Sequence, residues 1–425
     1  MGITNLLIFF TMKRLLSLLT LLIILASCAE EKERKVVLII IDGVPADVLE
    51  SVNTPNMDAI AKVGGYARAY QGGEKDGYSQ TPTISAPGYM NMITGVWGNK
   101  HNVWGNAVRN PNYNYWSIFR AAEELKPELH TAIFSTWEDN RTKLIGEGKP
   151  AAGSIKLDYA FDGFELDTVA FPHGDSRIFI HQIDEHVTNE AYSYIKEQAP
   201  DVSWVYLEYT DDMGHSFGDS PQMVESVEMA DDQIGRIWKA IQYREENFNE
   251  EWMLAVTTDH GRSPSDGKGH GGQSDRERTT WIVTNLNDLN ERFKDGLAVV
   301  DIMPTALDFI GIELPEAQKA ELDGVPYSGK ISLHSPKVNY KNGNLKLDWK
   351  PVGTGNVEIL YTKTNEFADG GEDAYEPLGK VSVGEGAFQT ELDLEPGKYK
   401  FIIKGYNNWV NVWLELEDET VAEEK

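Results

Sequence analysis

The chain has 425 residues, which is enough for one large domain and a smaller one. Its 41% hydrophobic and 25% charged residues are ordinary for a globular protein, but its formal net charge of −28 is not. Binding to a nucleic-acid duplex needs clustered Lys and Arg that neutralise phosphates, so this charge excludes a general role of that kind. Small anionic substrates are compatible with the charge, because bound metal ions can dominate the local field.

Residues 1–27 are typical of a targeting segment rather than of a folded domain. A basic pair, Lys13-Arg14, precedes an apolar run that ends in Leu25-Ala26-Ser27-Cys28. This order resembles a bacterial lipoprotein signal peptide, in which the cysteine becomes lipidated. Cys28 is the single cysteine of the chain, so an intramolecular disulfide is excluded and lipidation is its predicted use. The alternative is an N-terminal transmembrane helix that begins near Met1, for which the apolar run after the basic pair is short.

We expect residues 28–35 to form a charged tether that cannot pack against the folded part. The predicted location is therefore the cell envelope of a bacterium. The protein would be lipid-anchored to a membrane, by preference the outer membrane, and would face the periplasm or the exterior.

Residues 36–330 alternate between apolar strands and amphipathic helices. Val36–Ile41 is a continuous, mostly β-branched apolar run, which is typical of a strand covered on both faces. This alternation predicts an α/β domain with a mainly parallel sheet between two layers of helices. Further predicted strands are Trp204–Tyr209 and Trp252–Thr257, and predicted helices are Ile183–Gln198 and Met223–Tyr243.

Residues 331–425 have a different pattern, in which apolar and polar residues alternate and turn residues separate the runs. We expect a small antiparallel β-sandwich, similar to fibronectin type III or immunoglobulin-like modules. Such a sandwich could be a spacer or a carbohydrate contact. Its predicted strands include Leu345–Trp349, Val357–Tyr361, Tyr399–Ile403 and Trp409–Leu414.

Candidate metal ligands stand where three predicted strands of the α/β domain end. In open α/β sheets the site lies beyond the carboxyl ends of the strands, so we expect these side chains to converge. A single Asp at such a place is more often a turn or helix cap. Three carboxylates and three imidazoles together form a set that suits zinc. The six candidates are Asp42, Asp211, His215, Asp259, His260 and His270.

These motifs resemble those of the nucleotide pyrophosphatase/phosphodiesterase branch of the alkaline phosphatase superfamily, over residues 36–311. The first metal Asp of the family, which follows an apolar strand, matches Asp42. The D-x-x-G-H motif matches Asp211 through His215, and the D-H-G motif matches Asp259 through Gly261. The last His of the family matches His270.

The resemblance implies an alkaline-phosphatase-like fold for the α/β domain and two Zn²⁺ ions. Asp211, His215 and His270 would hold one ion. Asp42, Asp259 and His260 would hold the other, together with the nucleophile.

The nucleophile is implied by the family pattern P-T-x-S/T-x-P, which Pro82–Pro87 match. Ser85 would be the nucleophile and would begin a helix, where free N–H groups and positive potential favour attack on an anion. A zinc ion would lower the pKa of its hydroxyl and contact its oxygen, so Ser85 would also be a metal ligand. Without the metal set, Ser85 would be interpreted as a helix cap. Thr83 and Thr81 are the alternative nucleophiles.

An asparagine that binds a non-bridging phosphoryl oxygen follows the family's nucleophile at an offset that lands on Asn106. Its side-chain amide would stabilise negative charge on the transferred group. Asn102 is a neighbouring alternative for this role.

The chain departs from the family at Ala86, where nucleotide-cleaving members carry an aromatic residue that clamps the base. Tyr89, Trp97 or Trp104 could supply another apolar wall. Tyr89 also stands where formylglycine sulfatases require an Arg, which favours an unmodified serine. Four cations near the metal motifs could contact a substrate anion or form scaffold ion pairs: Arg262, Lys268, Arg276 and Arg278.

The predicted function is zinc-dependent hydrolysis of small anionic esters, with phosphodiesters favoured, through a phosphoryl group bound to Ser85. Alternatives within the superfamily are a phosphomonoesterase, a phosphonate hydrolase and a zinc-dependent sulfatase. An alternative of another class is a catalytically inactive, glycan-binding surface lipoprotein.

Overall fold

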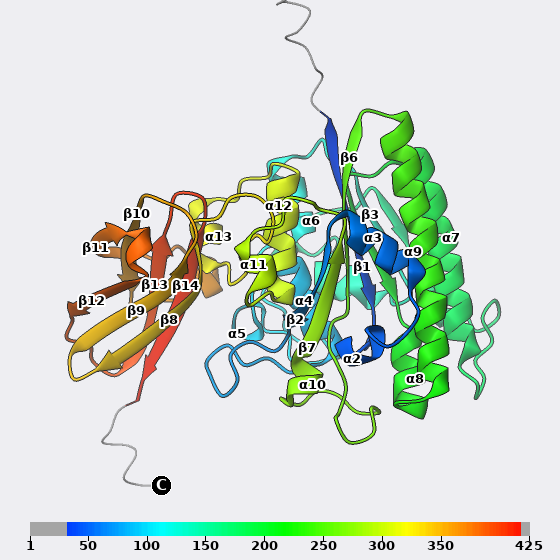
Figure 1. Ribbon diagram of the computed structural model, residues 1–425, viewed down its shortest axis with the longest axis horizontal. Helices are drawn as coiled ribbons and strands as arrows, with labels where there is room; N and C mark the ends of the chain where they lie inside the picture. The colour runs from blue at the N-terminus through cyan, green and yellow to red at the C-terminus, as the bar shows by residue number, and fades with distance from the viewer. Residues whose placement is uncertain (1–31, 418–425) are drawn as a thin grey trace, which may run out of the picture.

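The computed structural model describes residues 32–417. The predicted signal peptide and Cys28 lie outside the described residues. In the described part, a large α/β unit packs beside a smaller all-β unit (Figure 1). No helix among residues 32–417 has both the length and the apolar character that crossing a membrane needs.

A seven-stranded sheet forms the centre of the α/β unit, in the order β2-β7-β6-β1-β5-β3-β4. β7 pairs antiparallel with both of its neighbours, and the other strand pairs are parallel. The prediction of a mainly parallel sheet is therefore confirmed. The strands are β1 (Glu33–Ile41), β2 (Gly65–Tyr70), β3 (Thr131–Ser135), β4 (Tyr159–Phe161), β5 (Val202–Leu207), β6 (Glu250–Thr257) and β7 (Thr279–Thr284).

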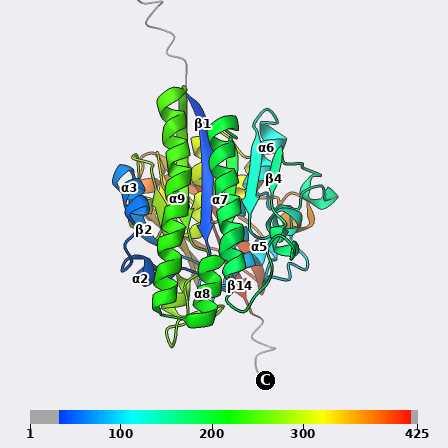
Figure 2. The same cartoon turned by 90° about the vertical axis from the view of Figure 1, so that its right-hand side faces the viewer.

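Helices cover both faces of this sheet because alternate residues of β1 face opposite sides. Val37, Ile39 and Ile41 join one core with α7 and α9, the two long helices in front of β1 in Figure 2. Residues 36, 38 and 40 join a second core with α4, α6 and α12. The helices are α2 (Ala46–Leu49), α3 (Pro55–Val63), α4 (Ser85–Thr94), α5 (Gly98–His101), α6 (Ile118–Leu125), α7 (Ile178–Gln198), α8 (Tyr209–Phe217), α9 (Pro221–Asn247), α10 (Asp275–Arg278), α11 (Glu291–Lys294), α12 (Ile302–Phe309) and α13 (Glu316–Glu321).

The strand predicted over Trp204–Tyr209 ends earlier than expected, since β5 stops at Leu207 and Tyr209 is the first residue of α8. The cause is a contact that the local pattern does not contain. The carboxylate of Asp184, on α7, accepts the N–H groups of Glu208 and Tyr209 at 3.1 and 2.9 Å. These bonds satisfy amides at the beginning of α8 and turn the chain into the helix.

The predicted tether also ends earlier than expected. β1 begins at Glu33, and Lys35 is 4% exposed. The Lys35 Nζ atom lies 2.6 Å from Asp201 Oδ1, so a charged residue expected in the tether is packed in an ion pair. A lysine can be buried in this way when it is paired.

The C-terminal unit consists of two antiparallel sheets, as predicted, in the orders β11-β10-β13-β14 and β12-β9-β8. Their facing side chains form one core that includes Leu345, Trp349 and Phe401. A short 3₁₀ helix, η5 (Glu366–Asp369), follows β10. The strands are β8 (Leu333–Lys341), β9 (Asn344–Pro351), β10 (Asn356–Thr362), β11 (Glu376–Ser382), β12 (Ala387–Glu391), β13 (Gly397–Lys404) and β14 (Trp409–Leu416).

Candidate active site

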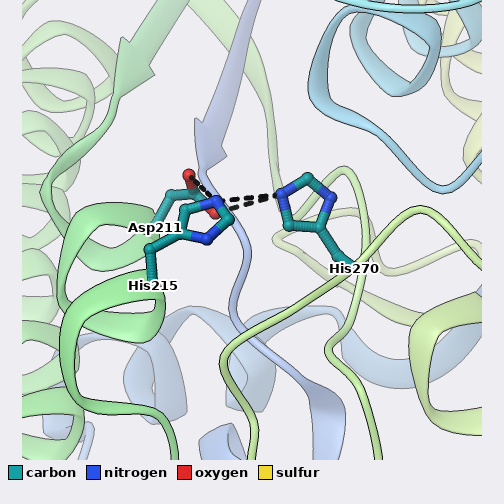
Figure 3. A group of neighbouring side chains, drawn as sticks. All are labelled: Asp211, His215 and His270. Atoms are coloured by element: carbon teal, nitrogen blue, oxygen red, sulfur yellow. Dashed lines mark hydrogen bonds and ion pairs between the residues drawn. The ribbon is translucent and has the colours of Figure 1, made fainter.

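The first group of candidate ligands is Asp211, His215 and His270, whose ligand atoms all lie within 4.8 Å of one another (Figure 3). Asp211 and His215 are four residues apart on α8, so they share one face of the helix. His215 Nε2 lies 3.2 Å from Asp211 Oδ2 and 3.1 Å from His270 Nε2. His270 reaches this group from the loop between β6 and α10.

The second group is Asp42, Asp259 and His260, which is buried and has its ligand atoms within the same 4.8 Å. Asp42 follows β1, and Asp259 and His260 follow β6, the adjacent parallel strand. His260 Nε2 lies 3.2 Å from Asp259 Oδ2 and 3.5 Å from Asp42 Oδ1. The two neighbouring strands therefore bring these three residues to one edge of the sheet, as predicted from their strand-end positions.

The donor atoms of the second group fit a cation. His260 Nδ1 lies 2.9 Å from the carbonyl oxygen of Gly261, which can only accept, so Nδ1 carries the proton and Nε2 offers a lone pair. Burial lowers the pKa of His260, and nearby His270 lowers it further. Asp42 Oδ1 and Asp259 Oδ2 are buried and have no hydrogen-bond partner in the part of the chain that the structure describes. Three lone-pair atoms that converge in this way match the donor chemistry of a metal site.

The carboxylates of the site repel one another. Burial raises the pKa of Asp42, and the carboxylates of Asp259 and Asp211 raise it further. Burial also raises the pKa of Asp259. Burial acts in the same direction on Asp211, but the hydrogen bond from His215 and the charge of Arg262 reverse the effect and hold its pKa low. Bound cations would remove this repulsion.

Arg262 is a scaffold residue rather than an anion-binding residue. It is 1% exposed, and its guanidinium donates to the carbonyl oxygens of Gly43 and Asp211 at 3.0 and 2.8 Å and to the Asp211 carboxylate. A Cβ atom at Gly43 or Gly214 would lie within 2.5 Å of this guanidinium. Gly43, which follows Asp42, and Gly214 of the D-x-x-G-H motif are therefore required by the close approach of Arg262.

The other candidate cations also bind the scaffold or lie outside the cavity. Arg276 pairs with Asp47 and Asp219. Arg278 donates to Gln273 Oε1 and to two backbone carbonyl oxygens.

Ser85 begins α4, as predicted, and is 6% exposed. Its Oγ atom lies 3.4 Å from His260 Nε2, which places it beside the second ligand group. The alternative nucleophiles are fully buried and occupied elsewhere: Thr83 donates to Gly272 O, and Thr81 donates to Ser79 O. Of the three candidate nucleophiles, Ser85 is therefore the one whose hydroxyl lies beside the candidate ligands.

A cavity of about 220 Å³ is lined by four of the candidate residues, Asp42, Ser85, Asn106 and Asp211. Asn106 lines it, and its Oδ1 accepts the N–H of Ala86 at 3.0 Å, next to Ser85. The alternative, Asn102, does not line the cavity, and its amide is bonded within its own loop to Asn110 and Trp104. The lining residues are Asp42, Ser85, Tyr89, Asn106, Trp137, Tyr206, Glu208 and Asp211.

Sequence reasoning missed the residues that orient Asp42. The hydroxyls of Tyr89 and Tyr206 both donate to Asp42 Oδ2, the latter at 2.7 Å, which leaves Oδ1 directed at His260. Tyr89 was considered as an apolar wall and as the residue at the position of the sulfatase Arg, and Tyr206 only as a strand residue. No local pattern distinguishes such tyrosines from core residues.

Trp137 and Glu208 were also missed, although both line the cavity. Glu208 forms no ion pair among residues 32–417, and burial, followed by the charges of Asp212 and Asp184, raises its pKa. Glu208 stands just before α8. The sequence could have indicated that its side chain points into the cavity only if the end of β5 had been known.

A mainly parallel sheet that carries two carboxylate–imidazole groups and a helix-terminal serine at one edge is the arrangement of the alkaline phosphatase superfamily. The model of one family within it, type I phosphodiesterase / nucleotide pyrophosphatase, matches residues 36–350. The chain therefore belongs to the type I phosphodiesterase / nucleotide pyrophosphatase family.

Curated relatives match parts of the chain. Human ectonucleotide pyrophosphatase/phosphodiesterase family member 7 is 24% identical over 241 residues, which is 54% of this chain and 48% of the relative. The 2,3-bisphosphoglycerate-independent phosphoglycerate mutase of Natronomonas pharaonis is 31% identical over 141 residues, 32% of this chain and 26% of the relative. The chain thus spans about a quarter to a half of the length of these proteins.

Solved structures show the likeness of the fold. A 2-O GAG sulfatase superposes with a TM-score of 0.50 at 12% identity, over 85% of each chain. Human ectonucleotide pyrophosphatase / phosphodiesterase 5 gives a TM-score of 0.47 at 15% identity, over 66% of this chain and 96% of that one.

Proposed function

We propose that the chain is a zinc-dependent hydrolase of phosphate esters that favours phosphodiesters and uses Ser85 as its nucleophile. The observation that carries the proposal is the convergence of Asp42 Oδ1, Asp259 Oδ2 and His260 Nε2, with Ser85 Oγ 3.4 Å from the imidazole. In the proposed site, Asp211, His215 and His270 hold a second ion. When bound, two zinc ions would supply Lewis-acid charge that favours the ionised serine and stabilises the departing oxygen.

Ser85 and Asn106 have different roles in the proposed reaction. Ser85 Oγ attacks phosphorus in line and forms a phosphoserine ester, while the P–O bond to the first alcohol breaks and that alcohol leaves with the serine proton. The Asn106 amide donates to a non-bridging oxygen of the transferred group. Water then cleaves the phosphoserine, which restores Ser85 and releases the remaining phosphate monoester.

The charge of the cavity favours diesters over monoesters. A phosphomonoester carries close to two negative charges at neutral pH, whereas a phosphodiester carries one. Among residues 32–417, no Lys or Arg lines the cavity, and Arg262, Arg276 and Arg278 are bonded elsewhere. The missing positive charge disfavours the phosphomonoester dianion. A sulfate monoester, which is also a monoanion, is the second candidate substrate.

A panel of 4-nitrophenyl esters tests the proposal. We expect kcat/KM for bis(4-nitrophenyl) phosphate to exceed that for 4-nitrophenyl phosphate by at least about tenfold, the factor that 1.4 kcal/mol of unmatched charge produces. A phosphonate monoester and a sulfate ester complete the panel. A preference for the phosphomonoester would contradict the charge argument, and a preference for the sulfate ester would replace the proposed substrate class.

We also propose that Cys28 is lipidated and that the protein is anchored in the cell envelope. The support is the sequence order alone, a basic pair, an apolar run and a single cysteine. Metabolic labelling with a palmitate analogue should mark the wild type and not Cys28→Ala. Equal labelling of both would refute the anchor.

A further inference from the structure

The loop that carries Asn106, residues 101–112, is hydrogen-bonded to the C-terminal sandwich at the point where its two ends meet. The loop closes where the Asn112 N–H donates to His101 O at 2.8 Å. The side chain of Asn112 points outward from this closure, and its Nδ2 donates to Ala368 O at 2.9 Å. Ala368 belongs to η5 of the sandwich. The closure of the loop is therefore tied to the neighbouring unit.

The chain that leaves the loop continues along η5. Asn114 Nδ2 donates to the same Ala368 O at 2.9 Å. The rings of Tyr115 and Phe367 lie 5.0 Å apart, and both residues are buried in one small apolar cluster with Val96. These contacts seat η5 firmly against the segment that follows the loop.

The chain that enters the loop is fixed to the sandwich as well. Lys100, on α5, is 1% exposed, and its Nζ lies 2.7 Å from Asp323 Oδ1 and 2.9 Å from Asn411 Oδ1, on β14. A buried ammonium is tolerated only when such partners satisfy it, so moving the sandwich away would be costly.

The inner side of the same loop faces the nucleophile helix. His101 Nε2 lies 2.7 Å from Asn91 Oδ1, on α4, and Asn106 Oδ1 accepts the N–H of Ala86, also on α4. The loop is therefore held between the helix of Ser85 and the sandwich. Four-residue α5 has too few internal hydrogen bonds to keep the loop in place without these contacts.

We propose that the sandwich is a positioning element of the active site, in which η5, through Asn112, fixes the loop that places the Asn106 amide beside Ser85. This inference rests on the role proposed above for Asn106. A donor that stabilises developing charge must be held in place before the reaction, and a displacement of about 1 Å can cost up to about 100-fold in rate. Asn112 and Phe367 are positioning residues, since neither lines the cavity.

Two variants test the link from its two sides. Asn112→Ala removes the bond to Ala368 O from the loop, and Phe367→Ala removes the packing from the sandwich. We expect each to lower kcat/KM for bis(4-nitrophenyl) phosphate by about tenfold with unchanged zinc content. Asn408→Ala is the matched control, because Asn408 bonds Ser332 N and Leu333 O inside the sandwich and should lower Tm while leaving kcat/KM as in the wild type. Wild-type kcat/KM in both test variants would overturn the proposal.

A double-mutant cycle separates positioning from a general loss of stability. In an Asn106→Ala background, Asn112→Ala should lower kcat/KM by less than about twofold, because its effect passes through the amide already removed. Additive losses would show that Asn112 acts by another route and would overturn the proposal.

Hydrogen exchange gives a readout that does not depend on activity. Amides of residues 101–112 should exchange faster in Phe367→Ala than in the wild type, and should be unchanged in Asn408→Ala. Equal exchange in all three proteins would overturn the proposal even if the enzyme is active. Faster exchange in Phe367→Ala, in a wild-type protein that hydrolyses none of the test esters, would support the structural link and refute only the proposed function.

Discussion

The Nε2 atoms of His215 and His270 lie 3.1 Å apart, and both face the carboxylate of Asp211. His270 Nδ1 lies 3.0 Å from the carbonyl oxygen of Thr83, to which it can only donate, so its Nε2 directs a lone pair at His215. The backbone beside the nucleophile thus fixes the tautomer of a candidate ligand. A carbonyl group that orients a metal-binding histidine in this way is a common partner in such sites.

Removal of metal is expected to abolish activity and lower Tm. The ligand groups include buried carboxylates whose repulsion a bound cation would relieve, and a ligand present at about 1,000 times its Kd adds about 4 kcal/mol of stability. Dialysis against a chelator, followed by metal analysis, calorimetry and rate measurements, checks this. Zinc should restore both Tm and kcat. Full activity in protein with almost no metal would refute the zinc site. Purified protein that contains almost no zinc and hydrolyses none of the esters would instead favour the glycan-binding alternative.

Ser85→Ala should lower kcat by at least about 1,000-fold, since loss of a nucleophile removes the covalent route. The side chain is not needed to hold the fold, because its one described contact is to His260. Kinetics should be measured together with zinc content, which should stay near that of the wild type. Ser263→Ala, in the loop that leads to His270, is the control and should keep wild-type kcat. Activity that survives in Ser85→Ala would reopen the assignment to Thr83.

Tyr206→Phe should weaken zinc binding at the buried group by about ten- to 100-fold, the usual effect of losing a residue that orients a ligand. The change removes the donor that lies 2.7 Å from Asp42 Oδ2 and leaves the ring in place. Competition with a chelating dye measures the affinity. Tyr209→Phe, on α8, removes a hydroxyl that does not contact Asp42 and should bind zinc as the wild type does. Identical affinities of the two variants would contradict the role of Tyr206.

The pH dependence of stability should contain a contribution from His101. Burial lowers its pKa to about 3 in the folded state, against 6.5 for the ordinary side chain. Between these values the unfolded chain binds the additional proton, so the free energy of unfolding rises with pH from about 3 to 6.5, by at most about 1.4 kcal/mol per unit. In His101→Asn the slope should be smaller over this window. Denaturant titrations at several pH values give the slopes, and equal slopes would contradict the prediction.

Much of the fold follows from local pattern. The apolar run Val36–Ile41 is completely buried in β1, and the strand before Asp259 is also found as predicted. The beginning of α8 could not be predicted, because it depends on the carboxylate of Asp184, which reaches Glu208 from another helix. Boundaries set by remote side chains leave no trace in the neighbouring sequence.

The candidate site was likewise predicted only in part from local sequence. Asp211 and His215 were found because Asp211 comes just after a predicted strand and the pair matches the D-x-x-G-H motif of the family. The structure adds that both lie on one face of α8. Tyr89 and Tyr206 were not assigned to Asp42, because segments far apart in the chain bring these three side chains together. The metal-binding and catalytic roles of the candidate site residues remain predictions.

The direction of β1 has a consequence for access to substrate. This strand has nine residues, so at about 3.3 Å per residue it separates Glu33 from Asp42 by about 30 Å. In Figure 1, β1 starts at the upper edge of the sheet and runs down toward α2. A lipid on Cys28, as proposed, would therefore join the chain before the end of β1 that lies away from Asp42. In such an anchored protein, water-soluble esters would reach Ser85 more readily than lipids of the anchoring bilayer.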